Sequence, residues 1–397
     1  MALFRHATIL LCASLTTLTG CGKDDAGGDP GPGFVDDASA ASGLVFTVTD
    51  SSYTSSRLLY NDLKTGDLRT VLSAESGDPA LFWLGTELIF FNRTTDRRNF
   101  KRLDPRNPNP QLSAELATPL AGVGDPSDLL PLTGDQVMLA HRDAGVVFVM
   151  DVKTGAVVQK IEADWDFDGK ANAQLRPVSL LAWDATTTYL LHQGKGNDSM
   201  QTLNGTQQVF VLKLGADGQW SVVDQNDAKA KIQGIKLPIS NPAHLLKDVE
   251  TLTVNGTCTL WDKTCTSGFA DIDTTAKTAT MLFDTSALKL KGNGRMVPTG
   301  SGHFYGATVR DTGDPMNPGE KTITRFFPDN QTADQVFMFP AGSPGCCGLY
   351  FDKSSLALWI GDSTTSGTGS FSIYKDDTLA GTLELDALPY DGLFISP

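Results

Sequence analysis

The sequence predicts an all-β chain that folds as a seven-bladed β-propeller, with its N- and C-terminal strands closing one blade. Three observations predict this fold: short apolar runs, a repeated pair of strands, and acidic turns at a regular spacing. From Gly43 onward, turn residues interrupt the apolar runs roughly every eight to twelve residues, and no helical periodicity is sustained. The chain has 39 Gly and 20 Pro in 397 residues and is 20% charged, which favours many turns over long charged helices.

A strand–turn–strand motif recurs along the chain. Each copy has a proline or glycine, an apolar strand, a polar turn and a second apolar strand. The clear copies are DPALFWLGTELIFFNR from Asp78, DPSDLLPLTGDQVMLAHR from Asp125, RPVSLLAWDATTTYLLHQ from Arg176 and NPAHLLKDVETLTVNG from Asn241. Weaker copies are GRMVPTGSGHFYGATVR from Gly294 and PGCCGLYFDKSSLALWIGD from Pro344. We interpret each copy as strands a and b of one blade, numbering the strands of a blade a to d from the innermost outward.

A second hairpin with an acidic turn follows each copy. These turns contain Asp62, Asp104, Asp151, Asp217, Asp273, Asp329 and Asp376. The six intervals between them average about 52 residues, a spacing typical of a propeller blade of four antiparallel strands. The acidic turns therefore predict seven c–d hairpins.

The two ends of the propeller region complement each other. Residues 388–396 (LPYDGLFIS) resemble an innermost strand with no partner after it. Residues 43–50 and 57–72 read as strands b, c and d with no strand a before them. Pairing the two ends completes the seventh blade and removes the exposed edges that an open ring would leave.

The turns Asp62–Gly66 and Asp151–Gly155 share the pattern D-x-x-T-G and resemble the turns of YVTN-type and quinoprotein-type bacterial propellers. The resemblance covers most of the chain and implies a propeller architecture. Quinoprotein blades also repeat a tryptophan after T-G, but residues 67–72 and 156–161 contain none. We therefore expect no pyrroloquinoline cofactor.

The N-terminal segment has the pattern of a bacterial lipoprotein leader. Arg5 and His6 precede an apolar run, Ala7–Leu18, which is too short to cross a bilayer as a mature helix. The tetrapeptide Leu18-Thr19-Gly20-Cys21 resembles the lipobox, which implies cleavage before Cys21, its acylation with palmitate or similar chains, and attachment to the lipid bilayer. The alternative is an ordinary secretory signal with a chance cysteine.

The lipobox resemblance sets the expected domain organisation. Residues 1–20 would be a signal peptide, 21–42 a flexible acidic tether rich in Gly, Pro and Asp, and 43–397 the propeller. Gly22 follows the cysteine in place of the aspartate that retains enteric lipoproteins at the inner membrane. The expected location is therefore the outer membrane, on its periplasmic face or at the cell surface.

In a propeller, the b–c and d–a connections lie on one face, which we call the long-loop face. The long d–a connections 162–176 and 224–241 and several long b–c loops fall there, whereas the opposite face has short turns. Long loops on a rigid scaffold commonly carry binding sites. We therefore expect a protein or glycan partner on the long-loop face.

Four of the six cysteines remain after Cys12 leaves with the signal peptide and Cys21 is acylated. Cys258 and Cys265 bracket one loop and predict a local disulfide in an oxidising compartment. The adjacent pair Cys346 and Cys347 starts a strand a beside the central channel. Either it forms a strained vicinal disulfide that serves as a rigid or redox-sensitive ligand platform, or it is a turn clamp or a pair of buried thiols.

Two further groups of polar residues are candidate sites. Asp164, Asp166 and Asp168 with Gly169 match the start of a calcium loop, although Leu175 stands where the closing acid is needed; the alternative is a solvated acidic loop. Asn92, His141, His192 and Asn255 align at or beside the ends of strands b. Together with Cys346 and Cys347, they would line a ligand-binding mouth or hold a transition metal, or they would hydrogen-bond the loops.

Charge and motifs limit the functions that the sequence supports to two classes, partner binding and catalysis in the central channel. The net charge of −14 has the wrong sign for a protein that binds the phosphate backbone, so we expect no nucleic-acid partner. The sequence carries no G-x-S-x-G, H-E-x-x-H, Walker or C-x-x-C-H motif. We favour a non-catalytic binding or scaffold propeller with no certain cofactor beyond possible calcium. The alternative is an envelope enzyme, lactonase-like or redox, with a site in the axial channel.

Overall fold

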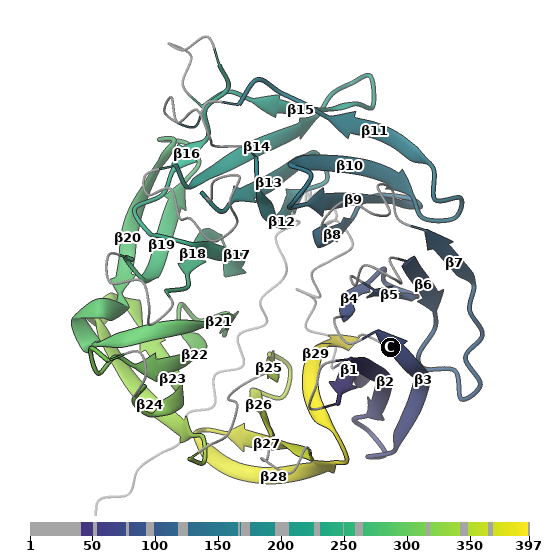
Figure 1. The fold of residues 1–397 in the computed structure, drawn as a ribbon, viewed down its shortest axis with the longest axis vertical. Coiled ribbons are helices and arrows are strands. Elements are labelled where there is room, and N and C mark those ends of the chain that lie inside the picture. Colours follow the sequence, from purple (N-terminus) through teal and green to yellow (C-terminus); the bar gives the residue numbers. More distant parts are fainter. Residues whose placement is uncertain are drawn as a thin grey trace, which may run out of the picture.

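The chain folds into a closed ring of seven β-sheets around a central axis, which confirms the predicted propeller (Figure 1). The computed structural model describes residues 41–50, 54–76, 79–92, 99–117, 126–165, 167, 175–194, 206–225, 231–248, 250–258, 265–314, 318–341, 348–363 and 368–395. Among these residues the sheets are antiparallel throughout, and each runs outward from an innermost strand a.

Blade 1 joins the two ends of the propeller. Its strands in order are β29 (Leu388–Ile395), β1 (Gly43–Thr49), β2 (Ser55–Asp62) and β3 (Leu68–Ser76). The C-terminal strand β29 pairs antiparallel with β1, from Gly43↔Ile395 to Thr49↔Leu388. All of β1 is buried, so closure buries backbone and side chains that an open ring would expose.

The other six blades follow in chain order. Blade 2 contains β4 (Pro79–Trp83), β5 (Leu88–Asn92), β6 (Asn99–Leu103) and β7 (Ala114–Ala117). Blade 3 contains β8 (Pro126–Pro131), β9 (Gln136–His141), β10 (Val146–Asp151) and β11 (Val157–Ile161). Blade 4 contains β12 (Pro177–Asp184), β13 (Thr187–His192), β14 (Gln208–Leu214), β15 (Trp220–Val223) and a short extra strand, β16 (Ile235–Lys236).

Blade 5 contains β17 (Pro242–Asp248), β18 (Thr251–Gly256), β19 (Gly268–Asp273) and β20 (Thr278–Asp284). Blade 6 contains β21 (Leu290–Pro298), β22 (Phe304–Arg310), β23 (Lys321–Phe327) and β24 (Thr332–Met338). Blade 7 contains β25 (Gly348–Asp352), β26 (Ala357–Ser363), β27 (Gly369–Lys375) and β28 (Thr378–Leu385). The described helices are two short 3₁₀ turns, Thr285–Leu288 and Pro328–Asn330, so no described helix could cross a membrane.

The core is divided among the interfaces between blades. Each of the seven interfaces holds its own cluster of buried apolar side chains among the described residues, such as Leu44, Phe46 and Phe371 between blades 1 and 7. The innermost strands contact one another around the whole ring, from β29 through β4, β8, β12, β17, β21 and β25 back to β29. Successive side chains along each strand point to opposite faces of the sheet. Each blade therefore packs one face against the preceding blade and the other face against the following blade.

The acidic residues predicted from the sequence spacing all lie in c–d turns. In the turn after β2, one carboxylate oxygen of Asp62 accepts hydrogen bonds from the backbone N–H groups of Lys64 and Thr65 at 2.8 and 3.0 Å. These bonds hold the pKa of Asp62 below its usual value. Gly66 completes the turn with a φ of 79°, a left-handed conformation that glycine adopts without strain.

Candidate functional site

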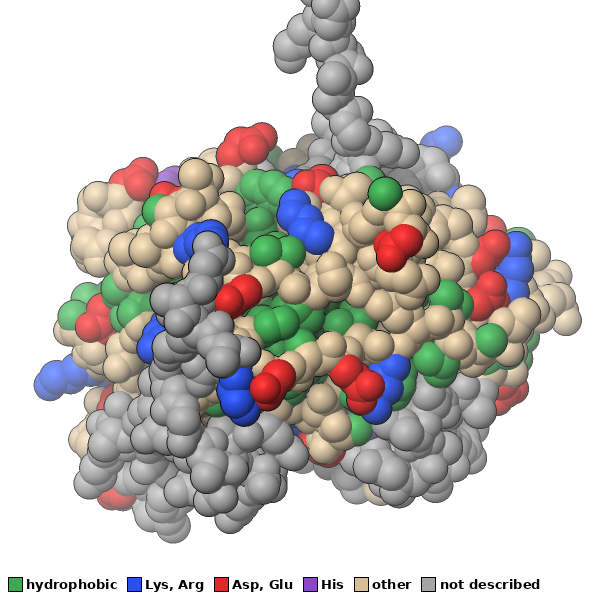
Figure 2. Space-filling view, turned by 90° about the horizontal axis from the view of Figure 1, so that it is seen from above, with side chains coloured by type: hydrophobic (Ala, Val, Ile, Leu, Met, Phe, Trp, Pro, Cys, Tyr) green, Lys and Arg blue, Asp and Glu red, His purple; other side chains and the backbone are tan. Residues whose placement is uncertain are grey.

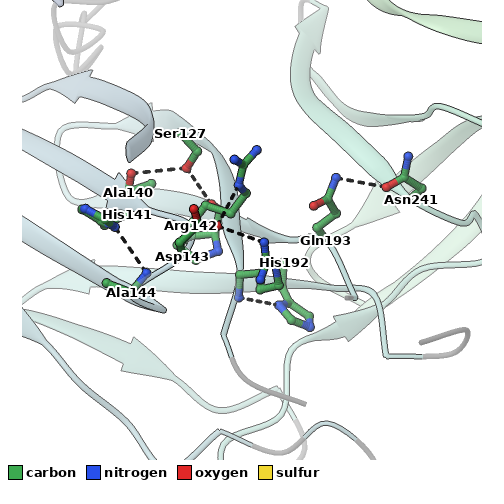
Figure 3. Close-up of polar contacts among 11 residues, drawn as sticks. Ser127, Ala140, His141, Arg142, Asp143, Ala144, His192, Gln193 and Asn241 are labelled. Carbon is green, nitrogen blue, oxygen red and sulfur yellow. Dashed lines mark hydrogen bonds and ion pairs between the residues drawn. The ribbon is translucent and has the colours of Figure 1, made fainter. Parts of the chain in front are cut away.

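The aligned polar residues lie where the sequence places them, at or beside the ends of strands b on the long-loop face. We call Asn92, His141, His192 and Asn255 the strand-b rim. All four are at most 1% exposed. Figure 3 shows His141 and His192 within a polar network that spans blades 3 and 4. The hydrogen bonds of each rim residue indicate whether its side chain holds the neighbouring loop or faces a ligand.

His192 is completely buried and ties the start of strand a to the end of strand b in blade 4. Its Nδ1 accepts a hydrogen bond from the backbone N–H of Arg176 at 3.0 Å, so the ring proton lies on Nε2. Nε2 has no hydrogen-bond partner among the described residues. The imidazole stacks against Phe167 with ring centroids 4.3 Å apart. Burial, with a contribution from the charge of Arg176, lowers the pKa of His192 to about 3, so the imidazole is neutral.

The other three rim residues hold their own loops and strands in the same way. The side-chain oxygen of Asn255 accepts from the backbone N–H of His244 at 2.9 Å, across blade 5. Nδ1 of His141 accepts from the backbone N–H of Ala144 at 3.3 Å (Figure 3). Asn92 donates to Asn99 at 2.6 Å. Within the described structure, these contacts favour the loop-bonding interpretation of the rim over a ligand-binding or metal-binding one.

Arg176 and Asp143 join the rims of blades 3 and 4. Arg176 is 4% exposed, and its guanidinium donates to the Asp143 carboxylate at 3.0 Å. Arg142 contacts the same carboxylate at 3.3 Å (Figure 3). Burial lowers the pKa of Arg176, an effect that Asp143 opposes. Sequence reasoning did not single out this ion pair, because its partners lie in different repeats and no local motif marks them.

Two long d–a connections meet over blade 4. Trp165 forms an isolated parallel bridge with Ile232, and the Ile232 N–H donates to the Asp164 carbonyl at 2.8 Å. The Asp164 carboxylate pairs with Lys231 at 3.0 Å. The aromatic residues between the predicted calcium ligands point inward: Trp165 packs edge-on against Phe210 at 4.8 Å.

The remaining predicted calcium ligands, Asp166 and Asp168, lie outside the described residues, so calcium binding stays a prediction. In the described part of the chain, no group of three or more His, Cys, Asp or Glu side chains is arranged to hold a metal ion.

The predicted loop disulfide is present. Cys258 and Cys265 are bonded, and both are buried at the start and end of the b–c loop of blade 5. The adjacent pair Cys346 and Cys347 lies outside the described residues, as does Cys21. The vicinal disulfide and the acylation of Cys21 therefore remain predictions.

An ion pair that sequence reasoning missed lies on the innermost strands. Arg295 of β21 reaches across blade 7 to Asp391 of β29, where the guanidinium and carboxylate are 2.7 Å apart. Its guanidinium also stacks over the Tyr350 ring of β25 at 4.6 Å from the ring centre. The Arg295 side chain is 36% exposed and that of Asp391 23% exposed, so the pair is accessible from solvent near the axis.

Polar side chains of strands a also bond the next blade. Asp128 accepts from the Leu180 N–H at 2.7 Å, and Asp391 accepts from the Leu81 N–H at 3.0 Å. Ser179 accepts from the Leu245 N–H at 3.2 Å. These three side chains satisfy backbone donors of the inner ring, which gives the two aspartates a structural role beside any chemistry.

Comparisons with known proteins identify the fold and nothing finer. The sequence matches no protein-family model, and no curated protein matches it either. The structure is similar to that of a protein from Lactobacillus plantarum, at a TM-score of 0.57 and 11% identity, covering 90% of this chain and 100% of that one. It is also similar to a periplasmic gluconolactonase from Pseudomonas aeruginosa, at a TM-score of 0.56 and 13% identity, covering 89% of this chain and 99% of that one.

A third similar structure is a quinoprotein alcohol dehydrogenase-like protein from Bacteroides thetaiotaomicron, at a TM-score of 0.56 and 11% identity. That alignment covers 89% of this chain and 78% of the other. At these identities the similarity is one of fold, because one propeller scaffold serves unrelated functions. The chain is therefore a seven-bladed β-propeller of the shape shared by lactonase-like and quinoprotein-like propellers.

Proposed function

We propose that this protein is a non-catalytic binding propeller, anchored at the outer membrane through acylated Cys21, that holds a protein or glycan partner on its long-loop face. The bridge between the two long d–a connections over blade 4 carries this proposal. Trp165, Ile232 and the Asp164–Lys231 ion pair fix two loops against each other and against the scaffold. Loops held in one arrangement lose less conformational entropy on binding, which favours partner recognition.

The described contacts of the strand-b rim support the same proposal. His192, His141 and Asn255 each use an acceptor atom on a backbone N–H group of their own blade. These atoms therefore position loops. Figure 2, which views the disc from its edge, shows acidic and basic side chains interspersed there. The net charge of −14 supports the expectation that the partner is not nucleic acid.

Affinity purification from detergent-solubilised envelopes tests the proposal. The full chain carries a C-terminal tag, and co-purifying proteins, glycans and metal are measured together with the acylation of Cys21 by mass spectrometry. Lys231→Glu reverses a charge on the long-loop face, whereas Lys375→Glu reverses one on the opposite face. We expect a stoichiometric partner that the first variant loses and the second retains. A monomer without a partner, or equal loss in both variants, contradicts the proposal.

The second candidate is an envelope hydrolase with an axial site, and the Arg295–Asp391 pair is the observation that favours it. A guanidinium beside a carboxylate on the inner strands could bind and polarise a carbonyl compound such as a sugar lactone. The test is hydrolysis of glucono-1,5-lactone by the wild-type chain, by Arg295→Lys and by Arg310→Lys, which changes an exposed arginine at the end of β22 that pairs with Glu320. Activity that only Arg295→Lys reduces would favour the enzyme; background rates in all three chains would exclude this lactonase.

A further inference from the structure

A cavity on the short-turn face, between blades 3 and 4, is not part of the site described above. Its volume is about 440 Å³. It lies between the a–b turn of blade 3, the a–b turn of blade 4 and the outer strand β15. Its walls include the apolar side chains Leu132, Leu214 and Trp220. Its polar lining includes Asp135, Asp151 and Asp184. Of these, Asp135 pairs with Lys153 at 2.6 Å, and no lysine or arginine belongs to the described lining itself.

At two other interfaces, an arginine of strand c bonds the c–d turn of the next blade. Arg102 of blade 2 is 9% exposed, donates to the carbonyl of Val152 in the c–d turn of blade 3 at 3.2 Å, and pairs with Glu87. Arg325 of blade 6 pairs with Asp377 in the c–d turn of blade 7 at 2.8 Å. In both cases the guanidinium binds an oxygen atom in the c–d turn of the next blade, a backbone carbonyl for Arg102 and a carboxylate for Arg325.

Strand register shows which residue of blade 3 stands at the position of these arginines. The a–b turns of blades 2, 3 and 6 close with the same kind of backbone bond, Leu84 to Glu87, Leu132 to Gln136 and Thr299 to His303. Two residues after the carbonyl that closes each turn, strand b pairs with strand c as Ile89↔Arg102, Met138↔Val149 and Tyr305↔Arg325. Val149 therefore stands at the register position where the other two blades place an arginine, and it packs in the apolar cluster between blades 3 and 4, so blade 3 has no guanidinium at this position.

The lining of the cavity also contains a buried hydroxyl group without a hydrogen-bond partner among the described residues. Thr188 of β13 is completely buried, and its hydroxyl oxygen has no hydrogen-bond partner among the described residues. Its side chain lies on the same face of the strand as Leu190, which packs against blade 3, so it points toward this interface. A buried polar group without a partner is costly, and a donor group in the cavity would remove that cost.

We propose that the cavity between blades 3 and 4 binds a guanidinium group, supplied by a free small molecule or by an arginine side chain of a peptide. The guanidinium takes the place of the arginine that blade 3 lacks. It donates hydrogen bonds to Asp151, Asp184 and Thr188, and its alkyl chain lies against Trp220; Asp135 keeps its ion pair with Lys153. Asp151 and Asp184 stay ionised across physiological pH, because hydrogen bonds from their turns hold their pKa values low. This site lies on the face opposite to the proposed partner surface and does not depend on that function.

Calorimetric titration of the full chain tests the proposal with two probes, agmatine and N-acetylarginine methylamide, and a neutral isostere, N-acetylcitrulline methylamide. We expect saturable binding of at least one guanidinium probe and none of the citrulline probe. Agmatine alone binding indicates a free small molecule, and the arginine amide alone binding indicates a peptide side chain. No binding of either guanidinium probe, or equal binding of the citrulline probe, overturns the proposal.

Three substitutions locate the binding. Val149→Arg places the chain's own guanidinium in the cavity and should abolish binding of the probes. Asp151→Asn keeps the turn and removes the charge, so it should weaken binding about tenfold, the effect of one charge-assisted hydrogen bond. Asp273→Asn is the matched control, because Asp273 accepts the same two turn N–H bonds in blade 5 outside the cavity. Unchanged binding in Asp151→Asn overturns the proposal even if Val149→Arg fails to fold.

Discussion

His192 shows how a single buried residue can link the stability of blade 4 to pH. In the folded chain its pKa is about 3, whereas the ordinary value is 6.5. Between these two values the unfolded chain binds a proton that the folded chain does not. The contribution of His192 to the free energy of unfolding is therefore greatest above pH 6.5 and is lost as the pH falls toward 3.

Replacing His192 with asparagine should remove this dependence. Asn92 stands at the corresponding place of blade 2, opposite the first residue of strand a, and an asparagine oxygen can accept the Arg176 N–H as Nδ1 does. From pH 6.5 to 5, the wild-type chain should lose about 2 kcal/mol more unfolding free energy than His192→Asn. Urea unfolding at several pH values measures the difference in unfolding free energy between the two chains. The other titrating groups are the same in both chains, so their contributions cancel in this difference. Parallel pH profiles would contradict the prediction.

Single residues also show what the sequence could and could not predict about the site. The strand-b rim was found from the sequence because its members recur at or beside the end of strand b in four successive repeats. The Arg295–Asp391 pair was not, since its partners are separated by 96 positions and only the ring brings them together. The role of the rim was left open for a related reason: the conformation of the surrounding chain decides which group each side chain bonds, such as the backbone N–H of Arg176 for His192.

At the scale of elements, blades are held together by their outer strands as well as their inner ones. Gln159 of β11 donates to the Trp220 carbonyl of β15 at 2.6 Å and accepts from the Trp220 N–H at 2.9 Å. One side-chain amide thus satisfies both backbone groups at the start of β15. Figure 1 shows these two strands side by side at the periphery of blades 3 and 4.

Gln159→Ala should separate the outer edges of blades 3 and 4. Losing both hydrogen bonds should lower the free energy of unfolding by about 1–2 kcal/mol. Lys160→Ala, one residue along the same strand, removes only an exposed ion pair and should change it by less than about 0.5 kcal/mol. Chemical denaturation of the three chains provides the values. Equal stability of the two variants would show that the Gln159 bonds do not hold the blades together.

The disulfide between Cys258 and Cys265 stabilises one loop of blade 5. Because it closes a loop with a sequence separation of only 7, the entropy it removes from the unfolded chain is small. Replacing both cysteines with serine should lower the free energy of unfolding by roughly 2 kcal/mol and leave the fold intact. Comparing thermal melts of the wild-type and double-serine chains, each with and without reductant, tests this. A variant as stable as the oxidised wild type would be evidence against it.

Elements with local signals were predicted well, and elements without them were not. Prolines at the starts of strands a and acidic c–d turns gave the number of blades and their closure. The extra strand β16 and the Trp165–Ile232 bridge were read as loops, since each pairs only a residue or two and leaves no periodic pattern. Two residues of strand cannot be distinguished from a loop by alternation.

At the scale of the whole molecule, stability depends on closing the ring. Each interface has its own apolar cluster, and β29 contributes to two of them: Ile395 to the cluster between blades 1 and 2, and Phe394 to that between blades 1 and 7. Without β29, strand β1 would become an exposed edge and both interfaces would lose their innermost wall. The propeller should then lose the cooperative unfolding that a closed ring allows.

A chain that ends at Ala387 tests this dependence. Removing the buried side chains of β29 should lower the free energy of unfolding by roughly 5 kcal/mol or more and broaden the transition. A synthetic peptide of residues 388–397 should bind the truncated chain and restore the melting temperature, because it supplies the missing strand. Deleting residues 22–31 of the tether removes the same number of residues from outside the ring and should leave the melt unchanged. If the truncated chain unfolds as cooperatively as the full chain, closure by β29 does not govern the stability of the propeller.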